Sequence, residues 1–243
     1  MARYLKRHSL QARITHGVVA ISCILLMLTG AVVFIPQVAA ALPAEVVLAI
    51  RISHRVIGGI FLIVPLVSAF TALKGVKHLW KMYTQKWDSD DRLFMIKFVP
   101  YMLNCKKVHM PDQKEVKSGQ VIADGMLFFG CFLAGITGIF LVIGTSGVAL
   151  DPGFMVVNRF LHNVAFFILI IFGIAHIFLG SGAFQPYRGT ARLMFKDGLV
   201  SESDALYHWG HWARAELEKG GDNVVEIPDA EDAKGSKAAK GTK

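Results

Sequence analysis

The strongest constraint on this chain is a set of four long stretches that contain no Asp, Glu, Lys or Arg. Each stretch is long enough for the roughly 20 apolar residues that cross a bilayer as a helix. A helix is the expected form, because lipid cannot satisfy open backbone groups. This pattern excludes an ordinary soluble enzyme and a nucleic-acid-binding protein. The stretches run between Arg13 and Glu45, Arg55 and Lys74, Asp124 and Asp151, and Arg159 and Arg188.

We therefore predict an all-α integral membrane protein built as a four-transmembrane-helix bundle. Apolar residues at helical spacing among the lysines of residues 76–87 predict an interfacial helix, and residues 204–219 predict an amphipathic cytoplasmic helix. Residues 1–221 would form the membrane domain with its cytoplasmic extensions. Residues 222–243 are rich in Ala, Lys, Gly and acidic residues, which predicts a disordered tail. No internal repeat is apparent. The four spans are predicted near residues 15–36, 52–73, 122–144 and 156–181.

Lys and Arg residues orient these spans. Ten of them lie from Lys74 to Lys117, in the connection between the second and third spans. More basic residues precede the first span and follow the fourth, whereas the other two connections are short. Because Lys and Arg gather on the cytoplasmic side of a membrane, both termini are expected in the cytoplasm. The net charge of +8 is therefore read as membrane topology.

Four histidines lie in these spans or at their mouths: His16, His54, His162 and His176. The spacing of His162 and His176 places them on one helical face and about 21 Å apart along the axis. The alternating directions of the spans put His54 at the outer level with His162. The same argument puts His16 at the cytoplasmic level with His176. For any one histidine alone, a polar contact between helices or with headgroups explains its position equally well.

Two histidines from different helices, facing across a bundle core, are what a six-coordinate haem iron requires. We therefore predict two haem b groups per chain. His54 and His162 would be the axial ligands on the periplasmic side, and His16 and His176 those on the cytoplasmic side. Neither haem would be attached covalently, because the chain has no CxxCH motif.

The residues around the histidines fit the same prediction. Arginines recur three positions before three of the histidines, one turn outward, where they could bind haem propionates or lipid headgroups. Two small residues lie at the His162-to-His176 spacing after a histidine, on the face that meets the other haem. The arginines are Arg13, Arg51 and Arg159, with Arg55 beside them, and the small residues are Gly30 and Ser68.

These residues resemble a known family, the gamma subunit (di-haem cytochrome b556) of membrane-bound formate dehydrogenase. The resemblance runs from about Arg13 to about Trp212. It rests on Arg-Ile-Thr-His at 13–16, on Arg-Ile-Ser-His at 51–54 followed by Gly58, on the spacing of His162 and His176, and on the segment GTARLMFKDGLV at 189–200. The resemblance adds Gly58 to the expected haem surroundings.

The resemblance also implies a quinone site. The family has an Asn-x-Gly-Gln motif before its third membrane helix, and this chain has Lys117, Ser118, Gly119 and Gln120 there. Gly119 and Gln120 match, whereas Lys117 replaces the asparagine. The implied site for menaquinone or ubiquinone is formed by Lys117, Gly119 and Gln120 with His176.

The implied partners are a periplasmic iron–sulfur (beta) subunit and a molybdenum- or tungsten-containing catalytic (alpha) subunit, in a bacterial cytoplasmic (inner) membrane. Electrons from the iron–sulfur subunit would pass through the two haems to quinone near the cytoplasmic side. This chain would be the electron-transfer and quinone-reducing subunit of an oxidoreductase complex. It would not itself oxidise formate, so no residue of its own is assigned to that reaction.

Three alternatives remain open. The same plan suits the cytochrome b subunit of a nickel–iron hydrogenase or of another periplasmic oxidoreductase. A non-redox transporter could use intramembrane histidines as a proton relay, and broken helices and intramembrane carboxylates would favour it, but neither is evident. A haem-free membrane anchor is the third.

Overall fold

The computed structural model describes residues 2–183, 185 and 187–227. The chain divides into two compact units, which are described separately. The membrane unit comprises Ile14–Lys81 and Ile122–Gly180. The polar unit comprises Met1–Arg13, Met82–Val121 and Ser181–Lys243.

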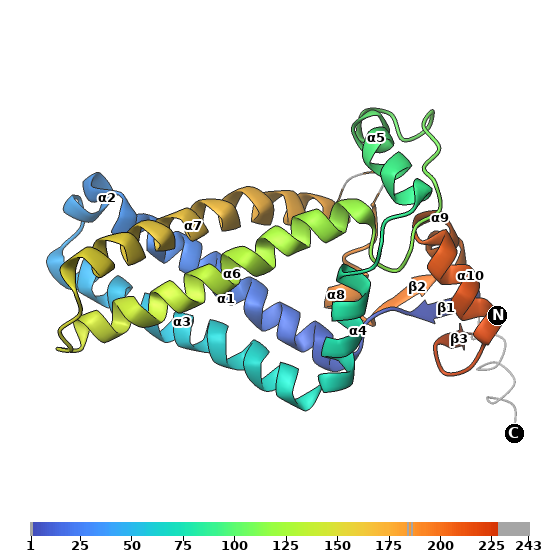
Figure 1. Cartoon of the computed structure of the whole chain (residues 1–243). Coiled ribbons are helices and arrows are strands. Elements are labelled where there is room, and N and C mark those ends of the chain that lie inside the picture. The colour runs from blue at the N-terminus through green and yellow to red at the C-terminus, as the bar shows by residue number, and fades with distance from the viewer. Residues whose placement is uncertain (1, 184, 186, 228–243) are drawn as a thin grey trace, which may run out of the picture. The chain divides into compact units, whose positions relative to one another are not determined.

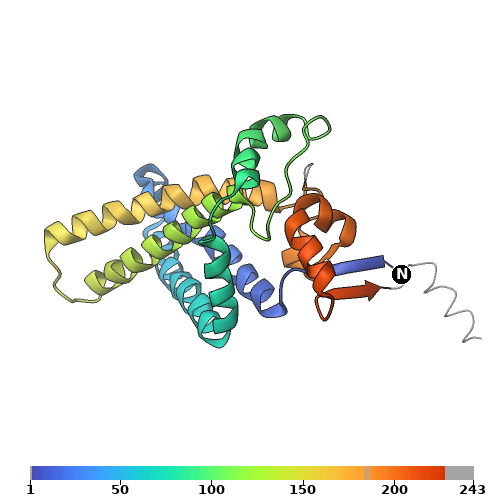
Figure 2. The same cartoon turned by 45° about the vertical axis from the view of Figure 1, so that its right-hand side comes forward.

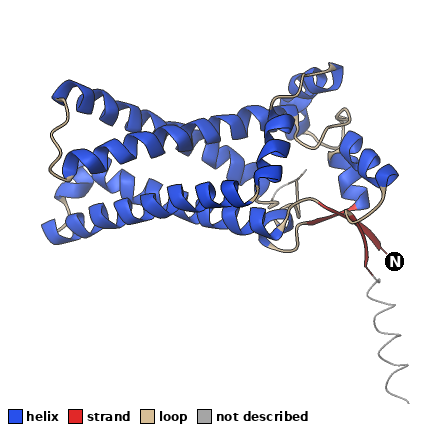
Figure 3. Ribbon diagram, turned by 60° about the horizontal axis from the view of Figure 1, so that its bottom comes forward, coloured by secondary structure: helices blue, strands red, loops and turns tan. Residues whose placement is uncertain are grey.

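Four long helices lie lengthwise together in the membrane unit (Figures 1 and 3), which confirms the predicted helical bundle. All four are long and apolar enough to span a bilayer. Their apolar side chains point largely outward, and Phe70, Phe132 and Val156 are 75%, 67% and 68% exposed. Such surfaces are stable only in lipid, so the chain is a multi-pass membrane protein. The helices are α1 (Leu10–Phe34), α3 (Ala44–Thr71), α6 (Ser118–Thr145) and α7 (Pro152–Gly180).

Each helix begins four to eight residues before its predicted span, because polar and charged residues near a membrane surface do not end a helix. α3 begins directly after Pro43, well before the predicted span, and includes Glu45 and Arg51. Pro36 starts the short helix α2 (Pro36–Ala40), in keeping with the preference of proline for the first turn. The connection that contains α2 and the α6–α7 connection lie at the same end of the bundle (Figure 1).

Glycines in α6 allow the helices to pack closely. A Cβ on Gly135 would stand 2.5 Å from Leu62 of α3, and one on Gly130 would stand 3.0 Å from Ile168 of α7. Small residues of this kind let membrane helices approach each other. Two polar contacts add to this packing: Thr15 of α1 donates to Ser68 Oγ of α3 at 2.8 Å, and Asn158 Nδ2 of α7 donates to the Thr137 carbonyl of α6 at 2.9 Å.

The polar unit contains a three-stranded antiparallel sheet, which the all-α prediction did not include. Strand β1 (Ala2–Lys6) lies between β2 (Leu199–Ser201) and β3 (Val224–Ile227), and Figure 2 shows β1 beside β3. The predicted disordered tail is therefore wrong for residues 224–227, whose Val-Val-Glu-Ile segment pairs with β1. Residues 228–243 of that tail lie outside the described residues. The strands are short, and no local pattern links partners so far apart in the sequence.

The core of the polar unit forms where the sheet meets the last helices. Leu5 of β1 is fully buried against Val200, Ala205, Trp209 and Ala213. The predicted helix over 204–219 is instead two helices, α9 (Glu202–His208) and α10 (Gly210–Lys219), because Trp209 leaves the helical conformation. The first turn of α10 donates backbone N–H groups to the Gln113 carbonyl, and a Cβ at position 210 would collide with Asp112. A preceding short helix, α8 (Arg192–Phe195), leads into β2.

The connection between α3 and α6 carries two further helices, α4 (Leu73–Tyr83) and α5 (Ser89–Leu103). α4 confirms the predicted helix over 76–87 as far as Tyr83, whereas α5 was not predicted as a helix. Trp80 of α4 and Ile96 of α5 are 73% and 74% exposed, as expected for side chains that meet a membrane surface. Cys23, Cys105 and Cys131 are free cysteines.

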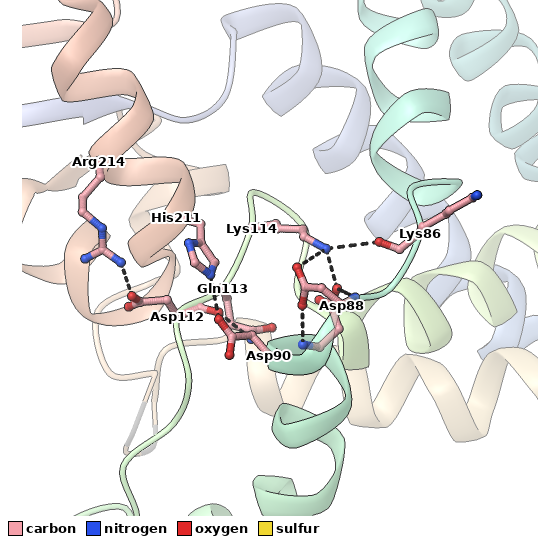
Figure 4. Close-up of polar contacts among 9 residues, drawn as sticks. Lys86, Asp88, Asp90, Asp112, Gln113, Lys114, His211 and Arg214 are labelled. Atoms are coloured by element: carbon pink, nitrogen blue, oxygen red, sulfur yellow. Dashed lines mark hydrogen bonds and ion pairs between the residues drawn. The ribbon is translucent and has the colours of Figure 1, made fainter.

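Charged contacts fix the segment that leads into α6 (Figure 4). Asp88 and Asp91 form a capping box at the start of α5. Lys114 Nζ donates to Asp91 Oδ2 at 2.5 Å, to Asp88 Oδ2 at 2.8 Å and to the Lys86 carbonyl at 3.2 Å. The same segment and α5 also reach α10, because Arg214 binds Asp112 and His211 Nε2 lies 2.8 Å from Asp90 Oδ2.

Lys117, the last residue before α6, is enclosed by aromatic rings. Its ammonium group lies 4.4 Å from the centre of the Tyr187 ring and 4.8 Å from that of Trp209. The guanidinium of Arg7 lies 4.3 Å from the Trp209 ring and 4.6 Å from the Trp212 ring. Lys117 is only 7% exposed. Burial, with the nearby charge of Arg7, lowers the pKa of Lys117 well below its usual value.

We expect Lys114→Met to destabilise the polar unit. The change leaves the buried Asp91 carboxylate without its cation, at a cost of about 2–3 kcal/mol. The hydrogen bond from Lys114 lowers the pKa of Asp88 to about 2, so that part of the stabilisation is present above pH ~4 and is lost as the pH falls to about 2. Thermal unfolding and limited proteolysis of residues 104–117 measure the effect. Lys219→Met, which removes an exposed contact to Glu216, is the control and should change neither.

We expect Lys117→Met to raise the melting temperature at pH 7, because it removes the cost of burying a charge that the ring contacts only partly offset. Because the pKa of Lys117 is lowered on folding, the full cost of burying its charge applies at pH values below the folded-state pKa. The cost shrinks as the pH rises above that pKa and disappears above pH about 10.4, where the unfolded chain also loses the proton. The advantage of the variant should therefore narrow as the pH rises toward 10. Unfolding curves at several pH values measure it, and a lower melting temperature at every pH would contradict the assignment.

Candidate functional site

The imidazoles of His54 and His162 face each other inside the bundle. Their ring centroids are 6.4 Å apart, with an interplanar angle of 74°. His54 lies on α3 and His162 on α7, so the two rings come from different helices. The structure thus brings together His54 and His162, the two histidines that the alternating directions of the spans placed at the outer level.

The imidazoles of His16 and His176 form a second facing pair. Their centroids are 6.1 Å apart and the rings are tilted by 42°. His16 lies on α1, whereas His176 lies on α7, about four helical turns after His162. One bundle therefore holds two imidazole pairs about 21 Å apart along α7.

Hydrogen bonds at Nδ1 set the orientation of the outer pair. Thr29 Oγ1 lies 2.8 Å from His54 Nδ1, and Thr137 Oγ1 lies 2.8 Å from His162 Nδ1. Each hydroxyl already donates its proton to a carbonyl one turn earlier, that of Leu25 or Leu133, at 2.7 and 2.6 Å. The threonine oxygen must therefore accept from Nδ1–H, which leaves the Nε2 lone pair available for a metal.

His176 has a carboxylate as its Nδ1 partner. Asp124 Oδ1 of α6 lies 3.1 Å from His176 Nδ1, and Asp124 is buried. An ionised carboxylate has no proton to donate, so it must accept a hydrogen bond from Nδ1–H. It therefore favours the tautomer protonated at Nδ1, with Nε2 free to bind a metal. Asp124 lies within α6, one of the candidate spans, so the expectation that no intramembrane carboxylate is evident is wrong.

The pair distances fit one iron between two imidazoles. With a metal–nitrogen bond of about 2.0 Å on each side and a little over 1 Å from Nε2 to each ring centre, the centroids should stand about 6 Å apart. The observed separations are 6.4 and 6.1 Å. The donor set also fits haem better than a bare metal ion. Within residues 2–183, 185 and 187–227 no three metal-binding side chains cluster, and haem iron needs only two from the protein.

Glycines stand against the outer pair. A Cβ on Gly30 would lie 3.3 Å from His54 Cε1, and one on Gly138 would lie 3.6 Å from His162 Cε1. Gly30 thus lies beside the outer pair, as its spacing from His16 in the sequence predicted. A Cβ on Gly58 would only reach ordinary contact, 4.0 Å from Leu26. Ser68 accepts the hydrogen bond from Thr15 described above.

The candidate arginines fall into two groups. Arg51, Arg55 and Arg159 lie on α3 and α7 of the membrane unit and are exposed, so their guanidinium groups can reach either propionates or lipid headgroups. Arg13 belongs to the polar unit and donates to the Lys196 carbonyl. Their contact with haem propionates stays a prediction.

The candidate quinone residues are divided between the two units. Lys117, Gly119 and Gln120 belong to the polar unit and His176 to the membrane unit, so their meeting at one site stays a prediction. A Cβ on Gly119 would stand 3.0 Å from Phe94 of α5, so a larger residue there would press against that ring. Gln120 is partly exposed on the first turn of α6. The amine of Lys117 contacts the rings of Tyr187 and Trp209.

The two helix pairs, α1 with α3 and α6 with α7, present their outer histidine in the same way. The threonine and histidine of each pair have the same separation in the sequence. The match extends further at the constant offset that relates His54 to His162, so an internal repeat is present, contrary to the expectation from the sequence. The offset relates Thr29, Gly30, Arg51 and His54 to Thr137, Gly138, Arg159 and His162, and also Gly17 to Gly125 and Cys23 to Cys131. The repeat is visible in the sequence alone and could have identified Thr29 and Thr137 as partners of the outer histidines.

A comparison with family models supports the same chemistry. The chain matches the model described as prokaryotic cytochrome b561 over residues 7–196, which include all four histidines of the two pairs. A search of curated proteins gives no match. The matched region covers most of the chain, and the family comprises helical membrane cytochromes that bind b-type haem and transfer electrons. The chain therefore belongs to the prokaryotic cytochrome b561 family.

Proposed function

We propose that this chain is the di-haem cytochrome b subunit of a membrane-bound formate dehydrogenase complex. It would take electrons from a periplasmic iron–sulfur subunit and deliver them to quinone near the cytoplasmic side. The observation that carries the proposal is the presence of two imidazole pairs at two depths of one bundle, at 6.4 and 6.1 Å. A single pair would hold a redox group near one membrane surface only, whereas two pairs would hold one near each surface.

The residues of the chain would divide the work as follows. His54 and His162 hold one haem b, and His16 and His176 hold the other. A bound b-type haem supplies an iron that takes up and gives back one electron. Because two histidines would hold each iron, dioxygen and other small molecules would be kept away from it, which suits electron transfer. Thr29, Thr137 and Asp124 hold three of the rings by Nδ1.

The arginines and the basic connections complete the proposal. Arg51, Arg55 and Arg159 would bind propionates on the outer side, and Arg13 would do so on the inner side. The ten basic residues from Lys74 to Lys117 favour a cytoplasmic polar unit, with both termini inside the bacterial inner membrane. The catalytic subunit with molybdenum or tungsten and the iron–sulfur subunit would then lie on the periplasmic side.

A reduced-minus-oxidised spectrum with haem quantitation tests the haem sites. We expect two haems b per chain in the wild type. His54→Ala or His162→Ala should lose one haem, and His16→Ala or His176→Ala should lose the other, because each iron would lose one axial ligand. His109→Ala, in the connection before α6, is the control and should keep both. If His54→Ala and His176→Ala removed the same haem, the pairing would be wrong.

The electron donor is tested in the native membrane, with the partner subunits present. Formate should reduce both haems, and dihydrogen should not. Reduction by dihydrogen but not by formate would assign the chain to a hydrogenase instead. Reduction by neither would exclude both of these complexes.

The quinone end is tested at Gln120, whose amide can donate to and accept from either redox form of a quinone. We expect Gln120→Leu to keep both haems reducible by the partner subunits and to slow their reoxidation by a quinone analogue in stopped-flow measurements. Lys117→Ala should have a smaller effect. Gln37→Leu, in α2 at the other end of the bundle, is the matched control and should reoxidise at the normal rate. Normal reoxidation in Gln120→Leu would place the quinone elsewhere.

A further inference from the structure

We infer that Asp124 is a positioning residue for His176 and that its carboxylate lowers the reduction potential of the haem held by His16 and His176. This inference rests on the proposed haem sites and adds a residue that the resemblance to the formate dehydrogenase subunit does not supply. It starts from the contact of Asp124 Oδ1 with His176 Nδ1 at 3.1 Å.

The inner pair differs from the outer pair in the charge of this contact. His54 and His162 donate to threonine hydroxyls, which are neutral, whereas His176 donates to a carboxylate. A negatively charged acceptor pulls the Nδ1 proton toward itself and increases the electron density on Nε2. A more basic Nε2 stabilises the oxidised iron relative to the reduced iron, which moves the potential in the negative direction.

The internal repeat places Asp124 at a ligand position. The offset that relates His54 to His162 also relates His16 to Asp124 and Ser68 to His176. The bundle thus has four equivalent positions at this depth, of which two carry histidine. Because His16 faces the site, the equivalent position on α6 is expected to face it as well.

The cost of the carboxylate argues for a role. Asp124 is the one acidic or basic residue between Ser118 and Leu150, a range that the structure describes throughout. It is buried in α6, one of the four candidate spans. Ionisable groups inside a membrane helix are costly and are retained when a partner uses them. The contact with His176 provides that partner.

Two substitutions separate the charge from the contact. Asp124→Asn keeps an oxygen that can accept from Nδ1 but removes the charge, whereas Asp124→Leu removes both. Thr137→Val, which removes the acceptor of His162, is the matched control at the outer pair. Each variant is purified as the full chain, its haem is quantified, and the potential of each haem is measured by spectroelectrochemical titration.

We expect Asp124→Asn to retain two haems and to shift one of them, the haem that is lost in His176→Ala, to a more positive potential. A tenfold change in the ratio of reduced to oxidised haem corresponds to about 59 mV for one electron. Asp124→Leu should shift the same haem and weaken its binding by about 10–100-fold, as loss of an outer-shell partner does. Thr137→Val should change the potential of the other haem only.

The outcomes separate this inference from the proposed function. Unchanged potentials in Asp124→Asn, or equal shifts of both haems, would overturn the inference while leaving two haems in place. Loss of both haems in Asp124→Asn would show a general structural role and would also overturn it. A wild type that binds fewer than two haems would instead refute the proposed haem sites, before any variant is compared.

Discussion

The bundle depends on lipid. Its four long helices turn most of their apolar side chains outward, and few residues of the spans are buried within the chain. In water this arrangement would expose a large apolar surface, whereas in a bilayer the acyl chains cover it. The interior is therefore free to hold small and polar side chains. Gly30, Gly138, Thr29, Thr137 and the imidazoles occupy that interior.

The membrane unit was largely predictable because helical periodicity acts over short distances. Charge-free stretches located the four spans, and their spacing placed His162 and His176 on one helical face. The partners of the imidazoles were not predicted. Thr29 and Thr137 are ordinary residues for a membrane helix, and only the internal repeat marks them. Asp124 was counted as the end of an uncharged stretch, although α6 begins well before it, at Ser118.

The polar unit was less predictable because its contacts join distant parts of the sequence. Nothing local in Ala2–Lys6 announces a strand that pairs with Val224–Ile227. The break at Trp209 depends on the carbonyl of Gln113 and the side chain of Asp112, which belong to the connection before α6. Lys117 was expected to face quinone, and its aromatic surroundings come from Tyr187 and Trp209, beyond the fourth span.

The position of β1 in the middle of its sheet also determines the order in which the protein can be completed during synthesis. Residues 2–6 are made before the first membrane helix, but both neighbouring strands, β2 and β3, are made only after the fourth. All four spans must therefore leave the ribosome before the first strand can form its hydrogen bonds. Until then its unpaired edges are open to other chains. The polar unit can therefore be completed only after the whole membrane unit has been synthesised.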